Sequence, residues 1–360
     1  MEAWLVDKDF ANYWIAARLV LSGQALDLFA DHATYFRHLT AEFGPDYPWR
    51  NWSYPPHYLL LIWPAGFFGY VPAMAGFLAA TLLAYLGAVR SFLGKVTVKP
   101  AVVVSFLFAS VVSNIDAAQN SFLTSALMLG GLAFRDRRPV LAGVLIGCLT
   151  IKPQLGVFVP LLLLYERKWT VITTAALTTV GMIGLSALLF GWETWQGYLA
   201  ETLPYQSRVM TEFSGYFLAI MPTVFGAIRS LGFGPNLALA LHAAVAILSL
   251  AFAGMVLVRC QDAGLRAAIL IMTTFVATPY CLNYDFGMGA AAVLLAVAHN
   301  GGATRSEQGR RALLAAASLM PILTVPLSLA GLPISPLLVL CGFAVVLLTA
   351  SEKIASRCAA

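Results

Sequence analysis

Two ionisable residues of this 360-residue sequence, Asp9 and Lys152, stand beside or within apolar segments, where they could do chemistry. The carboxylate of Asp9 can act as a general base toward a hydroxyl group, and such a base contributes about 10²–10⁴-fold to a rate. Asp9 can equally be an N-cap that satisfies free backbone N–H groups at the start of a helix. Lys152 is the only basic residue between Val140 and Tyr165. An ammonium at that depth must meet an anion, such as a lipid-linked phosphate, or snorkel to the headgroups.

Uncharged hydrogen-bonding residues accompany these two. Gln119 and Asn120 form a polar pair between apolar runs, and Gln154 follows Lys152. Asn283 and Asp285 lie in a late turn that begins with Thr-Pro. The Asp285 carboxylate is either part of a site or a cap of the next helix.

Aromatic residues are concentrated in two polar segments. Residues 48–57 read Pro-Trp-Arg-Asn-Trp-Ser-Tyr-Pro-Pro-His. They predict either a platform that stacks against a sugar or an interfacial aromatic belt with a proline turn. His57 fits an interfacial position better than a catalytic one. The loop from Gly191 to about Asn236 adds further Trp and Tyr residues and Arg208, whose planar guanidinium either grips a phosphate or is a solvated loop charge.

Several familiar chemical sites are absent from the sequence. It contains no Walker loop, no HExxH motif, no Gly-rich dinucleotide fingerprint and no Ser/His/Asp arrangement. The five histidines are dispersed, and the five cysteines stand far apart. We therefore expect no cofactor, no disulfide framework and no histidine- or cysteine-based metal site, while a divalent ion held by carboxylates stays open.

The composition defines the scaffold that must position these residues. Apolar residues make up 60% of the chain and charged residues 11%, with a mean hydropathy of +0.80. Soluble domains have about 25% charged residues, so a single soluble domain is excluded. With about 20 residues per crossing, we expect an all-α polytopic bundle of about 10–11 membrane helices in one domain, 1–360. The net charge of +5 is sorted by side, not clustered, and implies no nucleic-acid partner.

Apolar runs locate the expected crossings. The first run contains Pro64 and Pro72 and predicts an interfacial piece followed by a span. Lys152-Pro153 predicts a break between two short helices, because proline removes a backbone donor. The segment 215–232 is expected to be re-entrant or to lie on the surface. The runs are 58–89, 100–112, 120–134, 140–150, 155–165, 169–190, 236–258, 267–279, 286–299, 312–329 and 335–350.

The residues after Asp9 predict an amphipathic helix that ends near Gly23. Its apolar side chains recur at the spacing of one helix face. Tyr and Trp on that face suit a helix that lies at the level of the lipid headgroups. The face comprises Phe10, Tyr13, Trp14, Ala17 and Leu21.

Lysine and arginine predict the orientation, because basic loops are retained in the cytoplasm. Residues 1–57 and the loop 191–236 then face outward, together with every candidate polar cluster and twelve of the 17 acidic residues. Fifteen of the 22 basic residues fall on the other side. They are Arg90, Lys95, Lys99, Arg135, Arg137, Arg138, Arg167, Lys168, Arg259, Arg266, Arg305, Arg310, Arg311, Lys353 and Arg357.

In order and spacing, several short motifs resemble those of glycosyltransferase family 87, which includes polyprenyl-phosphate-mannose-dependent α-1,2-mannosyltransferases. The resemblance covers about residues 9–290. The sequence departs from the family pattern in two places. Members carry a membrane helix directly before the Asp-Phe pair, whereas this sequence begins eight residues before it. Mannosyltransferase members carry a histidine in the late turn, where this chain reads Leu-Asn-Tyr-Asp. The matching motifs are Asp9-Phe10 with Tyr13 and Ala16-Ala17-Arg18, Tyr54-Pro55-Pro56, Gln119-Asn120, Lys152-Pro153 and Thr278-Pro279.

The resemblance implies a GT-C fold and inverting transfer of a hexose, such as mannose, from a polyprenyl-phosphate donor to a lipid or glycan acceptor. The chain would lie among the lipids of the inner (plasma) membrane with its site toward the periplasm or exterior. Asp9 would be the general base, and Lys152 and Arg208 would hold the donor phosphate. The alternatives are a transporter or flippase of a lipid-linked sugar and a non-catalytic subunit of an envelope-polysaccharide complex. Expected substrate-binding residues are Tyr13, Arg18, Tyr54, Gln119, Asn120, Gln154, Asn283 and Asp285.

Overall fold

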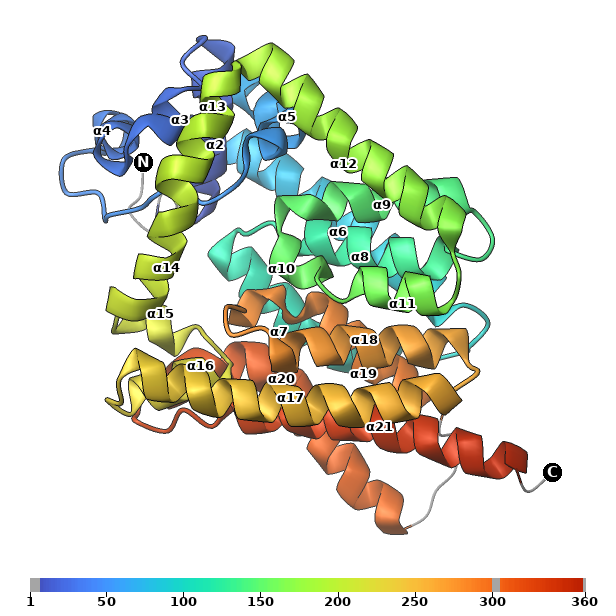
Figure 1. Ribbon diagram of the computed structural model, residues 1–360. Coiled ribbons are helices and arrows are strands. Elements are labelled where there is room, and N and C mark those ends of the chain that lie inside the picture. Colours follow the sequence, from blue (N-terminus) through green and yellow to red (C-terminus); the bar gives the residue numbers. More distant parts are fainter. Residues whose placement is uncertain (1–6, 300–304, 359–360) are drawn as a thin grey trace.

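The computed structural model describes residues 7–299 and 305–358, and within these ranges it contains helices but no strands (Figure 1). Five of the described helices are long and apolar enough to cross a membrane. They confirm an all-α membrane bundle, and the chain is a multi-pass membrane protein. The five are α6 (Tyr70–Leu93), α7 (Pro100–Ala117), α12 (Trp169–Phe190), α17 (Pro235–Arg259) and α21 (Ser335–Cys358).

Shorter apolar helices fill the interior of the bundle. Three of them, α8 (Ser121–Phe134), α18 (Ala263–Ala277) and α19 (Gly287–His299), are buried along most of their lengths. Helices that are apolar on every side must be covered by protein or lipid, and here the long helices cover them. The shorter runs of the sequence thus form the core of the bundle. Two further short helices are α9 (Pro139–Cys148) and α11 (Val159–Tyr165), whereas the longer α20 (Arg305–Leu329) contains a short apolar stretch, Ala317–Leu329.

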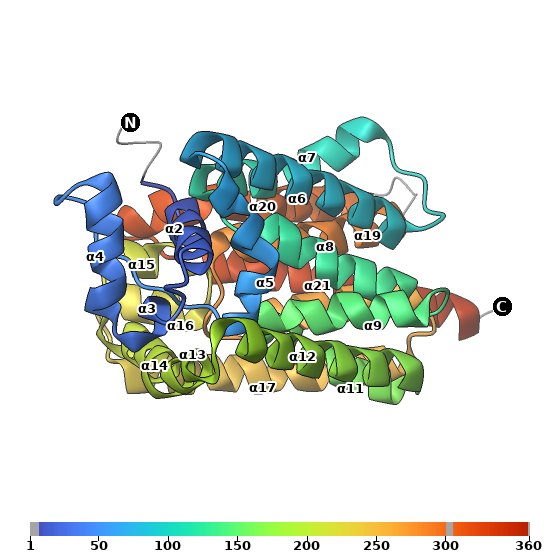
Figure 2. The same cartoon turned by 90° about the horizontal axis from the view of Figure 1, so that it is seen from above.

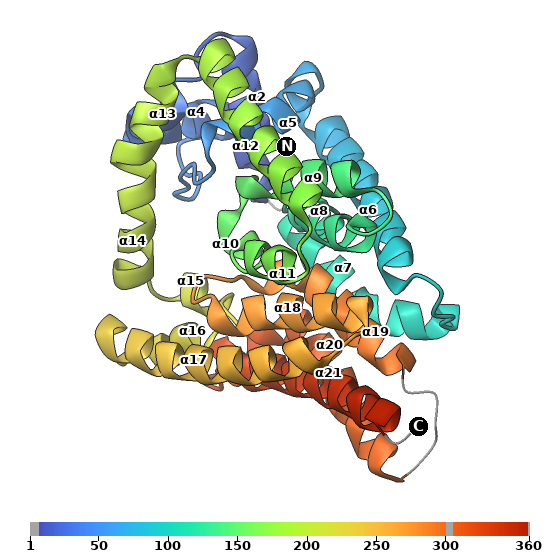
Figure 3. The ribbon, with the colours of Figure 1, turned by 45° about the vertical axis from the view of Figure 1, so that its right-hand side comes forward.

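A layer of short helices covers one end of the bundle, at the left of Figures 1 and 2. The N-terminal part of this layer contains α2 (Phe10–Leu21), α3 (Asp27–Ala30) and α4 (His32–Phe43). In Figure 3, α13 and α14 form an arm that runs from this part toward α15 and α16. The bounds in the second part are α13 (Trp192–Gly197), η4 (Tyr198–Thr202), α14 (Leu203–Glu212), α15 (Tyr216–Ala219) and α16 (Val224–Ser230).

The helix predicted after Asp9 is confirmed as α2, but its predicted surroundings are wrong. Gly23 follows it with a φ of +74°, a conformation that favours glycine. Tyr13 and Trp14 are buried instead of lying at the headgroups, and the Trp14 indole donates to the Phe68 carbonyl at 2.9 Å. The helix is apolar on more than one face because other helices, not lipid, surround it.

Three segments that the sequence predicts not to form one straight membrane crossing are divided into short helices. The first apolar run divides into short helices, η1 (Pro56–Tyr58), α5 (Leu59–Ile62) and η2 (Trp63–Phe67), before α6 begins. Residues 215–232 form the short α15 and α16 and do not form a long helix. The third is the Lys152-Pro153 break, where η3 (Leu149–Ile151) ends and α10 (Pro153–Gly156) begins.

The opposite end of the bundle carries the basic turns, and ion pairs join its helices. Arg135 and Arg266 both bind the buried carboxylate of Glu166, at 2.6 and 3.3 Å. Lys353 binds Asp262, which also caps α18 by accepting from the Leu265 N–H. The described charges are thus divided between the two ends, as the positive-inside pattern predicts for a membrane bundle.

Two glycines let α9 approach α12 closely. Gly143 and Gly147 form a small-xxx-small pair, a pattern that brings membrane helices together. A Cβ at Gly143 would lie 2.5 Å from Thr174 Cβ, and one at Gly147 would lie 2.6 Å from Thr178 Cβ. This packing places the C-terminus of α9, and therefore the Lys152 break, against the rest of the bundle.

We expect Gly147→Ala to lower the melting temperature of the purified protein, because overpacking a close contact costs about 1–3 kcal/mol. Gly181→Ala in α12 is the matched control, since no atom lies within 4 Å of its added Cβ. Thermal unfolding in detergent micelles measures both. Equal melting temperatures for the two variants would show that the α9–α12 contact relaxes freely.

Candidate active site

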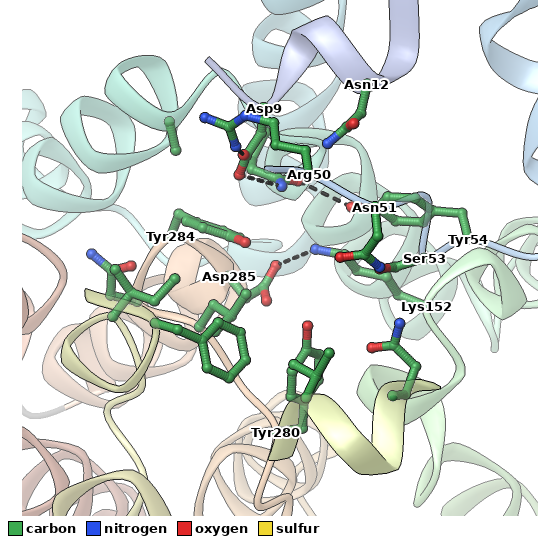
Figure 4. A pocket seen from close by; sticks show the side chains of 18 of the residues that line it. Asp9, Asn12, Arg50, Asn51, Ser53, Tyr54, Lys152, Tyr280, Tyr284 and Asp285 are labelled. Carbon is green, nitrogen blue, oxygen red and sulfur yellow. Dashed lines mark hydrogen bonds and ion pairs between the residues drawn. The ribbon is translucent and has the colours of Figure 1, made fainter. Parts of the chain in front are cut away.

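A cavity of about 1130 Å³ lies between the layer of short helices and the bundle (Figure 4). It receives residues from the segment before α2, the 48–55 stretch, the end of α7, the Lys152 break, α14, the late turn and α20. Breaks and helix ends leave backbone and side-chain polar groups free, and a water-lined cavity is where a membrane bundle tolerates them. The lining includes seven charged side chains: Asp7, Lys8, Asp9, Arg50, Asp116, Lys152 and Asp285.

Asp9 lies at the start of α2, but its side chain makes no capping hydrogen bond. Its Oδ1 accepts from Arg50 Nη1, and its Oδ2 accepts from Gln119 Nε2 at 2.7 Å. The Asp9 backbone N–H donates to the Ala117 carbonyl at 3.1 Å, which ties this segment to the end of α7. The carboxylate is therefore held by tertiary contacts and lines the cavity.

Arg50 holds two carboxylates of the N-terminal segment at once. In addition to its contact with Asp9, Arg50 donates from Nη2 to the Asp7 carboxylate at 2.7 Å. Burial lowers the pKa of Arg50, but the neighbouring Asp9 and Asp7 outweigh burial and raise it above its ordinary value. Arg50 thus remains a permanent cation next to Asp9. The sequence placed Arg50 only within an aromatic platform, and no local pattern indicated its partners.

Lys152 and Asp285 form a buried ion pair in the same cavity, with Nζ 2.8 Å from Oδ1 (Figure 4). Their side chains are only 7% and 2% exposed. Nζ also lies 5.4 Å from the centre of the Tyr284 ring, within cation–π range. The Asp285 carboxylate comes from η5 (Asn283–Phe286) and accepts from Lys152, which lies on a distant segment of the chain.

The other predicted amides lie in or next to the cavity. Gln154 lines it from α10. Asn283 also lines it, and its amide nitrogen donates to the Pro321 carbonyl at 2.8 Å. Gln119 binds Asp9 as described, while Asn120 is fully buried beside Tyr58 and does not line the cavity.

The structure separates two predicted basic residues from the cavity. Arg208 points outward from α14, is 64% exposed and pairs with Glu212 at 3.3 Å, although its neighbours Ser207 and Val209 line the cavity. Arg18 is exposed at the far end of α2, with its guanidinium 5.0 Å from the Trp14 ring centre. Neither arginine lines the cavity, because helix phase turns both away, so their predicted phosphate and substrate contacts gain no support from its geometry.

The aromatic segment 48–57 divides between cavity and core. Trp49 and Tyr54 line the cavity, and the Trp49 indole donates to the Tyr205 hydroxyl of α14 at 3.2 Å. Trp52 is buried and stacks on Tyr58. The segment is therefore neither wholly a sugar platform nor a headgroup belt.

His57 is buried in the protein, where the sequence favoured an interfacial position. It stacks on Trp195, with ring centres 5.6 Å apart, and its Nε2 lies 3.2 Å from the Thr150 hydroxyl. Burial lowers the pKa of His57 to about 4. The ring is therefore neutral at pH 7, and it does not line the cavity.

Tyrosines form a wall that the sequence did not predict as part of a site. Tyr280 and Tyr284 from the late turn point into the cavity opposite the 48–55 stretch (Figure 4). Asn12 and Asn51 add amide groups on the opposite wall. Flat rings with nearby amides suit a sugar, because apolar ring faces stack while amides bind hydroxyl groups.

No group of three or more His, Cys, Asp or Glu side chains that could hold a metal ion occurs in the part of the chain that the structure describes. Asp9 and Asp285 each bind a cationic side chain instead.

Fold and site together define a polytopic membrane protein with a charged, aromatic-walled cavity at one end. The family model described as glycosyltransferase family 87 matches residues 52–279, more than half of the sequence, so the chain belongs to this family and is a membrane glycosyltransferase. The match contains Tyr54, Gln119 and Lys152, whereas Asp9 and Asp285 lie outside it. No curated protein and no solved structure matches the chain significantly.

Proposed function

We propose that the protein transfers a hexose, such as mannose, from a polyprenyl-phosphate donor to a hydroxyl group of a lipid or glycan acceptor, with Asp9 as general base. The observation that carries this proposal is that Asp9 and Lys152, 143 positions apart, line one cavity. The base must reach the acceptor hydroxyl and the cation must reach the donor phosphate, and these two groups lie on opposite sides of one anomeric carbon. A single cavity meets that requirement.

The reaction is a single displacement. The acceptor oxygen forms a bond to the anomeric carbon while the bond from that carbon to the phosphate oxygen breaks. Asp9 takes the hydroxyl proton, and polyprenyl phosphate leaves with the bonding electron pair. Attack opposite the leaving group inverts the anomeric centre. A carboxylate suits this step because an unassisted sugar hydroxyl is a weak nucleophile.

We assign the donor phosphate to Lys152. The cavity holds four carboxylates and three cations, so a donor phosphate enters a site with a surplus of negative charge. Arg50 already binds two carboxylates, and Lys8 binds Asp116 at 2.9 Å. Lys152, like Lys8, has one carboxylate partner, but its side chain lies deeper, 7% exposed against 18% for Lys8, and its flexible stem lets the ammonium move toward a phosphate. A stronger contact as negative charge develops on the leaving phosphate would lower the barrier.

An apolar wall beside this charged region suits the prenyl chain. Val112 from α7 and Ile322 and Val325 from α20 line the cavity where it borders the long helices. Burial of apolar surface gives roughly 25 cal/mol per Å². We place the prenyl chain here, with its phosphate toward Lys152. We propose that the cavity faces outward from the inner membrane, because the basic turns lie at the opposite end and basic loops are retained in the cytoplasm.

Purified protein incubated with a radiolabelled polyprenyl-phosphate hexose and a membrane lipid extract tests the proposal. We expect labelled glycolipid or glycan and free polyprenyl phosphate. In proteoliposomes, labelled donor moved across the bilayer without product would identify a flippase. Neither product nor movement, with several hexose donors, would identify a non-catalytic subunit and overturn the proposal.

A further inference from the structure

We propose that Gln119 is a positioning residue that orients the Asp9 carboxylate for proton transfer, and that Tyr13 and Tyr54 fix the orientation of the Gln119 amide. This inference rests on the proposed role of Asp9 as base. It replaces the expectation that Tyr13 and Gln119 bind substrate directly. Gln119 lines the cavity beside Asp9, while Tyr13 lies behind it, away from the lining.

The hydrogen-bond partners of Gln119 leave only one orientation for its amide. Oε1 lies 3.1 Å from the backbone N–H of Asn120, which can only donate. The atom facing that N–H must therefore be the amide oxygen. The amide NH₂ then points to Asp9 Oδ2 at 2.7 Å. The alternative, with the two amide groups exchanged, would place two donors against each other and leave Asp9 without this hydrogen bond.

Two tyrosine hydroxyl groups strengthen the same orientation. Tyr13 donates to Gln119 Oε1, and the Tyr54 hydroxyl lies 2.8 Å from the Tyr13 oxygen and 3.2 Å from Oε1. Each tyrosine hydroxyl has one hydrogen to donate. The hydrogen bonds therefore all point the same way, from the two tyrosines to Gln119 Oε1 and from Gln119 Nε2 to the Asp9 carboxylate. Each hydrogen bond in such a series polarises the next. Burial raises the pKa values of Tyr13 and Tyr54, so both remain protonated donors.

Gln119 and Arg50 together determine which lone pairs of Asp9 remain available. Arg50 binds Oδ1 and Gln119 binds Oδ2, so neither oxygen can rotate away without breaking a hydrogen bond. The Asp9 side chain lines the cavity and remains 23% exposed, so an acceptor hydroxyl can reach the carboxylate. A base held in this way meets an acceptor hydroxyl at a fixed angle, and small misplacement of a catalytic group can cost about 10²-fold in rate.

Gln119→Glu tests the inference because it keeps the shape of the side chain but replaces the donor NH₂ by oxygen. We expect kcat to fall at least 10-fold while the donor KM changes less than threefold. The acid limb of the kcat/KM profile should move upward by about one pH unit or more, because two neighbouring carboxylates share a site and one becomes harder to ionise. The assay uses radiolabelled polyprenyl-phosphate hexose and membrane lipid extract over pH 4–9.

Gln119→Leu and Gln24→Glu complete the design. Gln119→Leu removes the donor without adding charge, so kcat should fall about as far but the acid limb should stay within 0.3 unit. Gln24 is exposed beyond α2 and outside the cavity, so Gln24→Glu should keep wild-type values. Thermal unfolding identifies any variant that loses the fold, and the shape-conserving Gln119→Glu keeps the test decisive.

The outcomes separate this inference from the proposed function. Loss of turnover in Asp9→Asn together with wild-type kcat and pH profile in Gln119→Glu would overturn the positioning role and leave Asp9 as base. Wild-type turnover in Asp9→Asn would overturn both. A Gln119→Glu effect confined to the donor KM would show substrate binding instead of positioning and would also reject the inference.

Discussion

Replacing Asp9 by asparagine is expected to reduce kcat by at least about 10²-fold and to leave the fold intact. A positioned base contributes about 10²–10⁴-fold, and an amide cannot take a proton from the acceptor. The fold should survive because the asparagine Oδ1 can still accept from Arg50, which also keeps its contact with Asp7. Turnover of radiolabelled donor and the melting temperature measure the two effects.

Asp46→Asn is the matched control for this experiment. Asp46 lies in the same outward region, is exposed and does not line the cavity. Its loss removes the same charge from the protein, so it controls for general electrostatics. Turnover of Asp9→Asn within threefold of Asp46→Asn would remove Asp9 from the chemistry.

Removing the charge of Lys152 is expected to damage stability and donor use, and a second substitution should separate the two. Lys152→Gln leaves the Asp285 carboxylate, 2% exposed, without its counter-ion. Breaking one side of a buried ion pair costs about 3–5 kcal/mol. Lys152→Gln/Asp285→Asn pairs two neutral amides and should recover most of the melting temperature. Neither protein can offer an ammonium to the phosphate, so both should show at least a 10-fold rise in donor KM.

Lys168→Gln at the opposite end controls for the loss of a lysine. Lys168 pairs with Asp136, both partly exposed, and such pairs contribute about 0–1 kcal/mol. This variant should keep the donor KM and nearly all stability. A stable double variant with wild-type donor KM and kcat would show that Lys152 serves only to neutralise Asp285.

Much of the fold was predictable because its signals are local. The composition alone predicted a membrane bundle. Pro153 predicted a break between two helices, because proline removes a backbone hydrogen-bond donor. The helix after Asp9 followed from its apolar spacing. Its burial was not predictable, because Tyr and Trp are equally at home among headgroups and in a protein core.

The candidate site was predictable in its members but not in its contacts. Asp9 and Lys152 were recognisable as charges beside apolar sequence, yet Arg50 gave no such signal within its aromatic segment. Arg208 looked suitable by residue type alone. Its exclusion depends on which side of α14 faces the cavity, and the packing of that helix against the bundle decides this, not the residue type.

The sequence by itself determined the kind of scaffold, the position of its principal break and the few residues able to carry charge near the membrane. Those features depend on residue type and on neighbours within a few positions. Only the tertiary structure decided the partners: Arg50 with Asp9 across 41 positions, Gln119 with Asp9 across 110, and Lys152 with Asp285 across 133. Such pairs form where packed helices bring distant segments together, and buried charges and amides must then bind whichever partners they meet.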